Sequence, residues 1–158
     1  MSDEIVLRDY RSADLDAMFR LDEKCFSAEF RFDRELMQMF AEEQGAVIRI
    51  AEESGDGIVG FVIAHVKRVA KEWRGYVVTL DVAEQHRGRG IARRLMEQAE
   101  FRIAAAGARW MELHVFTENE SAIRFYEGMG YERIAIRRRF YGEAGLDAFV
   151  YRKGLLNL

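Results

Sequence analysis

Several features that commonly report on fold or location are scarce in this chain of 158 residues. It has no proline, so its turns must rely on Gly, Asn, Asp and Ser. Its single cysteine, Cys25, excludes a disulfide within the chain and suits a reducing compartment such as the cytoplasm. Cys25 falls on the apolar side of a predicted helix, where we expect a buried and unreactive thiol.

Long apolar runs and excess positive charge are also missing. The longest apolar stretch, Ile58–Val66, is too short to span a bilayer, and the first four residues do not resemble a signal peptide. The formal net charge is −3, which gives no global basic field for binding nucleic acid. We therefore expect a single soluble domain over residues 1–158, with no membrane and no nucleic-acid partner.

Standard motifs for metals and nucleotides are absent as well. The three histidines have no Cys or His nearby at zinc-like spacing, so we predict no metal. No Gly-Lys-Ser or Gly-Lys-Thr of a Walker A loop is found. Gly88-x-Gly90 is followed by Arg93 where the dinucleotide fingerprint needs a third glycine.

The most informative stretch that is present is Arg87-Gly88-Arg89-Gly90-Ile91-Ala92. It lies between a strand-like run, Tyr76–Val82, and a helix-like run over residues 91–106. Glycines permit positive φ angles, a helix N-terminus offers unpaired N–H groups, and arginines donate charge-assisted hydrogen bonds. The stretch therefore predicts a site for the pyrophosphate of a small molecule. The alternative is a surface turn with solvated arginines.

Periodicity predicts the element order β-α-α-β-β-β-α-β-α-β-β. Strands are expected at 5–9, 46–51, 58–66, 75–82, 110–116, 131–137 and 149–153, and helices at 12–26, 34–43, 91–106 and 119–127. Ser12 and Asn119 are the predicted N-caps, and Gly45 and Gly107 are predicted just beyond helix ends. The alternation in the middle of the chain implies a parallel strand pair within a mixed sheet.

Within the strand at 75–82, period-2 alternation places Tyr76, Val78, Leu80 and Val82 on one face. The other face is then expected to carry Val77, Thr79 and Asp81.

Several motifs, in this order along the chain, resemble the GNAT acyltransferase superfamily. Arg87, Gly90 and Ala92 match its Arg-x-x-Gly-x-Ala acetyl-CoA loop. The segment 119–127, followed by Gly130-Tyr131 and later by Phe140-Tyr141, is similar to the RimI-like branch of N-terminal protein acetyltransferases. The resemblance covers nearly the whole chain. It implies an α/β (α+β) GNAT fold: a mixed, mostly antiparallel sheet with a splayed parallel strand pair and helices on both faces.

The resemblance implies acetyl-CoA as the co-substrate. In the family, the strand before the loop splays at a bulge, and the pantetheine pairs with its backbone. Leu80 and Val82 would supply those backbone groups, and an N–H there would polarise the acetyl carbonyl. Asn119 would contact the cofactor as well as cap its helix. The pyrophosphate would be held by the loop residues Arg87, Gly88, Arg89, Gly90, Ile91, Ala92 and Arg93.

Acetyl transfer to an amine needs the neutral amine, and histidine is the natural base near neutral pH. His114 is the candidate, five residues before Asn119. RimI proteins typically carry glutamate there. His114 together with Tyr76 instead resembles the eukaryotic N-terminal acetyltransferase that acts on chains retaining the initiator Met. Glu112, on the same strand face, is the alternative base or an orienting group. The structural alternatives are a satisfied strand histidine and a core tyrosine.

Further residues complete the candidate site by resemblance. Tyr126 matches the family tyrosine beside the CoA sulfur, where it can protonate the leaving thiolate; packing on its helix is the alternative. Four aromatic residues, Phe26, Phe30, Phe140 and Tyr141, are expected to line the acceptor groove together with Tyr76 and His114.

The function implied is transfer of an acetyl group from acetyl-CoA to a free N-terminal α-amine of a protein or peptide, by direct attack in a ternary complex. A ribosomal protein is one candidate acceptor. An α-amine titrates at about 7.7–8.0 and a lysine at about 10.4, which makes the α-amine easier to deprotonate. The alternatives are acetylation of a lysine, polyamine or other small amine, and an acyl-CoA-binding module without turnover.

Overall fold

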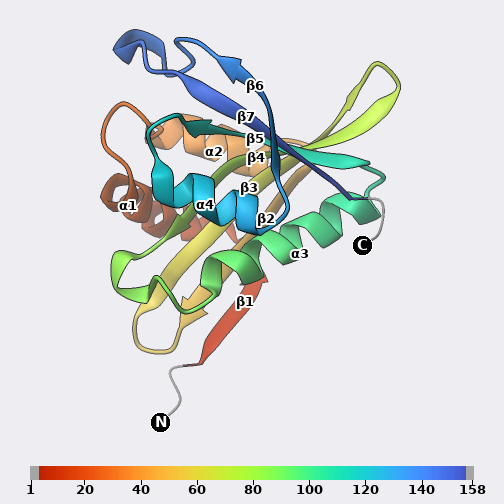
Figure 1. The fold of residues 1–158 in the computed structure, drawn as a ribbon. Coiled ribbons are helices and arrows are strands. Elements are labelled where there is room, and N and C mark those ends of the chain that lie inside the picture. The colour runs from red at the N-terminus through yellow and green to blue at the C-terminus, as the bar shows by residue number, and fades with distance from the viewer. Residues whose placement is uncertain (1–3, 156–158) are drawn as a thin grey trace.

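The computed structural model describes residues 4–155, which form one sheet with helices on both faces (Figure 1). The strands are β1 (Ile5–Asp9), β2 (Ala46–Glu53), β3 (Gly57–Val69), β4 (Glu72–Val82), β5 (Trp110–Phe116), β6 (Glu132–Arg137) and β7 (Ala148–Gly154). The helices are α1 (Leu15–Cys25), α2 (Arg34–Glu42), α3 (Ile91–Ala105) and α4 (Glu120–Gly128), with short 3-10 turns at Ser12–Asp14, Glu84–His86 and Gly142–Ala144.

The sheet order is β1-β2-β3-β4-β5-β7-β6, and every neighbouring pair is antiparallel except β4–β5. This confirms the predicted element order and the parallel pair within a mixed sheet. No helix in the described range is both long and apolar enough to cross a membrane.

Two apolar clusters fix the helices to the sheet, one on each face. One cluster joins α1 and α2 to the sheet and includes Leu15, Met18 and Met37. The other joins α3 and α4 to the opposite face and includes Leu95 and Tyr126. The sheet is therefore covered on both sides, as expected.

Most helix ends follow the predicted signals. Asn119 caps α4, because its side chain accepts a hydrogen bond from the N–H of Ala122 at 3.2 Å. Gly107 follows the end of α3 with a φ of +103°. The prediction for Ser12 is wrong: it lies inside the short turn before α1. There the buried Asp14 carboxylate accepts from the N–H of Arg11 and takes the capping role.

The β3–β4 hairpin is longer at its tip than the sequence predicts. Pairing continues to Val69 and Glu72, and the turn uses Ala70 and Lys71 at positive φ. Neither residue is a glycine, asparagine or proline, the types that commonly mark a turn, so the position of this turn could not be predicted from the sequence.

A bulge at Val78 in β4 inverts the alternation of side chains. Ile63 pairs with Thr79 while its neighbour Ala64 pairs with Val77, which leaves Val78 as the extra residue. The expectation that Tyr76, Val78, Leu80 and Val82 share one face is therefore wrong. Leu80 and Val82 pack into the cluster under α3, while Val78 packs on the α1–α2 side.

Strands β4 and β5 pair over a very short distance. The parallel ladder consists of Gly75 opposite Met111 and Tyr76 opposite Glu112. From Val77 to Val82 the β4 backbone has no β5 partner, which is the expected splayed pair. Gly75 permits the close approach before the splay, because a Cβ there would collide with Ile103 and lie 2.7 Å from the Met111 sulfur.

A buried pair of carboxyl groups ties α1 to β4. Asp22 is fully buried and Asp81 is 1% exposed. Asp81 accepts a hydrogen bond from the Thr79 hydroxyl at 2.6 Å. Burial raises the pKa of both groups, and the neighbouring Asp22 raises that of Asp81 further. A proton held between Asp22 Oδ1 and Asp81 Oδ2, two buried oxygens with no other partner among the described residues, would join the helix to the strand.

Gly75→Ala should lower the free energy of unfolding by about 1–3 kcal/mol, because the added methyl group overpacks the contact with Ile103 and Met111. Urea denaturation measures this. Gly128→Ala is the matched control, since no atom lies within 4 Å of a Cβ there, and it should be neutral or slightly stabilising. Equal stability of the Gly75 variant and the wild type would contradict the packing account.

Asp22→Asn tests the shared proton. A carboxyl whose folded pKa is raised stabilises the fold at low pH and loses that contribution as pH rises through the folded pKa. The amide N–H that this substitution introduces can donate a hydrogen bond to the Asp81 carboxylate whether or not that carboxylate is protonated. The stability of the variant relative to wild type should therefore rise by about 1 kcal/mol between pH 5 and pH 8.

Thermal melts across that pH range give the difference curve. Asp16→Asn, exposed on the same helix, controls for loss of charge and should show a flat difference. A flat curve for Asp22→Asn as well would show that the pair shares no proton.

Candidate active site

Tyr76 and His114 meet at the end of the short β4–β5 ladder. The Tyr76 hydroxyl lies 2.8 Å from Nδ1 of His114, and the two ring centroids are 5.5 Å apart. The two residues are 38 positions apart in the chain and come from different strands. Both were predicted from the sequence, and the fold brings them into direct contact.

His114 is held in an apolar and desolvated setting. Its ring stacks on Phe140 with centroids 4.0 Å apart and planes only 4° from parallel. Its Nε2 atom is buried and has no hydrogen-bond partner among residues 4–155. Burial lowers the pKa of His114, the nearby Arg137 lowers it further, and Glu112 opposes both. The imidazole is therefore neutral near pH 7 and able to accept a proton.

Glu112 is engaged elsewhere on the same face. Its carboxylate accepts a hydrogen bond from Arg152 at 2.9 Å. Within the described part of the chain no hydrogen bond joins Glu112 to His114. Glu112 therefore acts on His114 through its charge and not by orienting the ring.

Aromatic rings from three parts of the chain form a wall beside His114. Phe30, from the α1–α2 connection, lies 5.0 Å from Phe116 and 4.8 Å from Tyr141, measured between centroids. Phe140 contacts Tyr141 at 5.0 Å. Burial raises the pKa of Tyr141 to about 12, so its hydroxyl stays protonated. We call Phe30, Phe116, Phe140 and Tyr141 the aromatic wall.

Of the four aromatic residues expected from the sequence to line the groove, Phe30, Phe140 and Tyr141 belong to this wall, whereas Phe26 makes no ring contact with it in the described residues. The contact between Phe30 and Phe116 was missed, because it depends on how the α1–α2 connection folds back over β5. The stacking of Phe140 on His114 was also missed, although its pairing with Tyr141 was a visible signal.

Tyr126 lies in the cluster on the α3–α4 side, with 9% of its surface exposed. Its ring contacts Phe125 and Tyr131. Burial raises its pKa, and Asp81, Tyr141 and Tyr76 are near enough to raise it further. The hydroxyl is therefore protonated at neutral pH and lies within electrostatic reach of both site tyrosines.

The segment 87–90, which we call the Gly-Arg loop, leads directly into α3, as predicted. Gly88 and Gly90 both have a φ of +79°, and Gly90 is the N-cap of the helix. A Cβ at either glycine would meet nothing within 4 Å, so the space beside the loop is open. Ile91 is buried in the core and anchors the first turn, whose N–H groups have no partner within the helix.

The three loop arginines each make a contact that positions the loop. Arg87 donates from Nε to the Val82 carbonyl at 3.0 Å, and Arg89 donates to Glu53 at 3.0 Å. Arg93 reaches the Gly128 carbonyl at 3.5 Å, at the end of α4. Each guanidinium has five N–H donors, so these contacts leave Arg87 and Arg93 with donors that can face an anion.

The Val82 carbonyl is occupied on the side of α1. It accepts from Arg87 and from the Cys25 thiol, whose Sγ lies 3.5 Å away. Cys25 is half-buried and not fully buried as expected, and burial raises its pKa to about 11, so the thiol is protonated at neutral pH.

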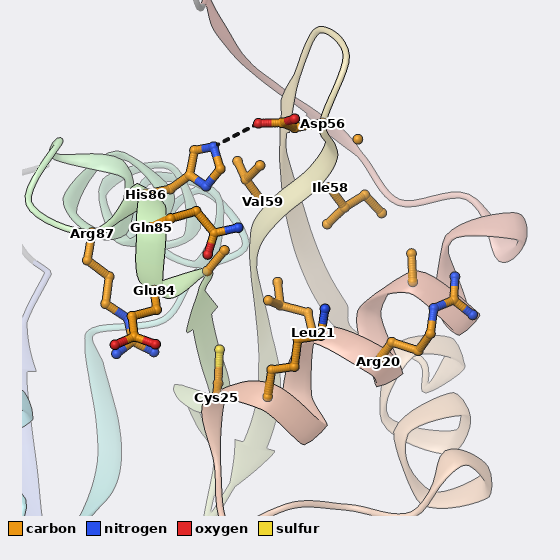
Figure 2. A pocket seen from close by; sticks show the side chains of 14 residues that line it. Arg20, Leu21, Cys25, Asp56, Ile58, Val59, Glu84, Gln85, His86 and Arg87 are labelled. Carbon is orange, nitrogen blue, oxygen red and sulfur yellow. Dashed lines mark ion pairs between the residues drawn. The ribbon is translucent and has the colours of Figure 1, made fainter.

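A cavity of about 680 Å³ lies between α1, the β2–β3 turn and the 84–86 segment (Figure 2). Arg87 and Cys25 line it, but Tyr76, His114 and Tyr126 do not. At its rim His86 lies 3.4 Å from Asp56 and 3.0 Å from Glu53.

Glu53, Asp56 and His86 have the spacing of a three-ligand metal site, which the sequence did not indicate because they come from separate segments. His86 Nε2 contacts both carboxylates, and Glu53 is further paired with Arg89.

Comparisons with known proteins agree with this geometry. The family model described as "Acetyltransferase (GNAT) family" matches residues 8–131. An uncharacterised protein of Mycobacterium leprae, ML0378, is 32% identical over 96% of this chain, which spans 41% of that protein's length. The N-alpha-acetyltransferase RimI of Mycobacterium tuberculosis is 32% identical over 77% of this chain and 72% of its own.

A solved structure titled as the NatC complex bound to Gag peptide and CoA contains a chain of the same fold. It superposes with a TM-score of 0.86 at 23% identity, covering 96% of this chain and 98% of that one. Its closeness shows the GNAT architecture. The sheet with its splayed parallel pair, the Gly-Arg loop opening α3 and the matching family model together show that the chain belongs to the acetyltransferase (GNAT) family.

Proposed function

We propose that this protein transfers an acetyl group from acetyl-CoA to a free N-terminal α-amine of a protein or peptide, by direct attack in a ternary complex. The observation that carries the proposal is the hydrogen-bonded pair of Tyr76 and His114 where β4 and β5 separate. The identity of 32% to a RimI named as an N-alpha-acetyltransferase supports it.

The residues present fit acetyl-CoA. The unpaired backbone of β4 at Leu80 and Val82 offers an edge for the pantetheine amides. At Val82 the backbone N–H is the group available to bond the pantetheine, because the Val82 carbonyl already accepts a hydrogen bond from Arg87. Gly88, Gly90 and the first N–H groups of α3, at Ile91, Ala92 and Arg93, suit the pyrophosphate, with Arg87 and Arg89 adding charge. Asn119, beyond capping α4, would touch the cofactor.

The proton route runs through Tyr76. His114 Nε2 is buried, so an acceptor amine reaches the imidazole through the Tyr76 hydroxyl and Nδ1. Tyr76 passes a proton to Nδ1 as it receives one from the amine, directly or through a water molecule. The raised pKa of Tyr76 ensures that it relays a proton and does not stay ionised.

Tyr126 acts on the sulfur as a hydrogen-bond donor. Because its pKa is raised, it holds its proton more tightly than a thiol does. Its hydroxyl therefore stabilises the departing thiolate by a hydrogen bond, and full proton transfer is not needed. This refines the sequence expectation that Tyr126 protonates the leaving group.

The aromatic wall, with Tyr141 as its polar member, is the surface against which the first acceptor residues pack. Phe26 lies at the end of α1, outside the wall, and is a weaker candidate for this role. A ribosomal protein remains a candidate acceptor, since a solved structure titled as the ribosomal-protein-S18-alanine N-acetyltransferase from Escherichia coli has the same fold. The half-buried, unreactive Cys25 fits a cytoplasmic location.

His114→Ala and Tyr76→Phe should each lower kcat by roughly 10²- to 10³-fold, since each breaks the proton relay. Tyr126→Phe should lower kcat by about tenfold, the worth of one hydrogen bond to a charged group. Release of free CoA thiol measures turnover. Tyr10→Phe is the control, because its hydroxyl is buried without a partner in the described residues and lies outside the site. Folded His114 and Tyr76 variants with wild-type kcat would refute the relay.

The acceptor class is tested with a panel of peptides that differ only at the N-terminus. It contains peptides that begin with Met, Ala and Ser, an N-blocked peptide with an internal lysine, and spermidine. We expect turnover of the free N-termini and none of the blocked peptide. Turnover restricted to the lysine peptide or spermidine would instead establish a side-chain or polyamine acetyltransferase. Tight acetyl-CoA binding without turnover would leave a binding module.

A further inference from the structure

The register of the last three strands places Arg137 on the same face as the candidate site. Arg137 of β6 lies opposite Ala148 of β7, and Ala148 lies opposite Phe116 of β5. Directly paired residues point to the same face of a sheet, and residues two apart on a strand do so too. Arg137 therefore projects from the face that carries Phe116 and His114.

A bulge in β6 produces this placement. Arg133 pairs with Tyr151, and Ala135 pairs with the next residue back, Val150, so one residue is extra between them. Arg133 points to the other face, where it bonds to the Tyr151 hydroxyl and covers the ring of Phe149 at 3.5 Å. Without the bulge, Arg133 and Arg137 would share a face, because they are four residues apart.

Arg137 is an exposed cation that has no partner in the described part of the chain, whereas its charged neighbours are paired. Glu112 is bonded to Arg152 at 2.9 Å, and Arg138 lies 3.4 Å from Asp147. No hydrogen bond or ion pair of Arg137 occurs within residues 4–155. Its charge nevertheless reaches the site, since it acts to lower the pKa of both His114 and Tyr76. An anion that entered the groove would meet a guanidinium whose positive charge is not paired with any carboxylate of the described residues.

The distance fits the first residues of an acceptor chain. From His114 to Arg137 the sheet spans two strand spacings of about 4.8 Å and two residues of about 3.3 Å, or about 12 Å between Cα atoms. An extended peptide advances about 3.3–3.6 Å per residue. If its α-amine is at Tyr76 and His114, its second to fourth residues pass within reach of the Arg137 side chain.

We propose that Arg137 is a specificity-determining residue that selects acceptors with a carboxylate side chain at the second to fourth position. The inference rests on the proposed N-terminal acetylation. A carboxylate pairs with the guanidinium by charge-assisted hydrogen bonds, and a lysine at the same position is repelled. The neutral aromatic wall then contacts the first residue of the acceptor peptide, and Arg137 selects by charge at the second to fourth residue of that peptide.

The test uses peptide pairs that start with the same residue and differ only by Glu, Gln or Lys at position two, three or four. For wild-type protein we expect kcat/KM for the best Glu peptide to exceed that of its Gln partner by about tenfold, and that of its Lys partner by more. Arg137→Gln should bring the Glu to Gln ratio to within about twofold. Arg137→Glu should reverse the preference toward Lys.

Arg109→Gln is the matched control, because it removes the same charge from an exposed position before β5, away from the aromatic wall, and should leave the ratio at its wild-type value. A Glu to Gln ratio near one in wild-type protein, or a ratio unchanged by Arg137→Gln, would overturn this inference alone. Turnover of lysine side chains with no turnover of any free N-terminus would overturn the proposed function and this inference with it.

Discussion

The rest of the site depends on the separation of β4 from β5 after only two paired residues. Gly75 lets the strands approach closely, and the bulge at Val78 then turns the end of β4 away. As a result Tyr76 points toward His114, while Leu80 and Val82 pack toward α3. One strand thus presents Tyr76, the side chain of the proposed proton relay, on one face and an unpaired backbone edge beside it. A regular ladder along the whole strand would close that edge and remove the place for a cofactor.

The contacts around this strand hold it in place from both sides. The buried carboxyl groups of Asp22 and Asp81 lie between it and α1, and Arg87 bonds its last carbonyl to the Gly-Arg loop. Arg93 of α3 reaches the Gly128 carbonyl at the end of α4. The Gly-Arg loop and the proposed relay therefore both adjoin β4. The proposed acceptor side, by contrast, is built from the α1–α2 connection and the β6–β7 hairpin.

The sequence predicted what depends on local pattern and on resemblance. Element order, the parallel pair, the caps at Asn119 and Gly107, and the candidates Tyr76 and His114 were all read from it, and the structure places those two side chains in contact. It could not predict what depends on register. The bulges at Val78 and Ile134 shift side chains by one position, and neither position carries a glycine that would signal it. The placement of Arg137 on the face that carries His114 follows from this register and was not predicted. The stacking of Phe140 on His114 was not predicted either.

In the proposed function, the Tyr76–His114 pair serves an N-terminal α-amine. The most direct measurement gives the protein one peptide with a free N-terminus and an internal lysine, then locates the acetyl group by tandem mass spectrometry. We expect one acetyl group, on the α-amine, formed by wild-type protein and lost in the His114→Ala variant. Acetylation of the lysine in preference to the α-amine would contradict the proposed function.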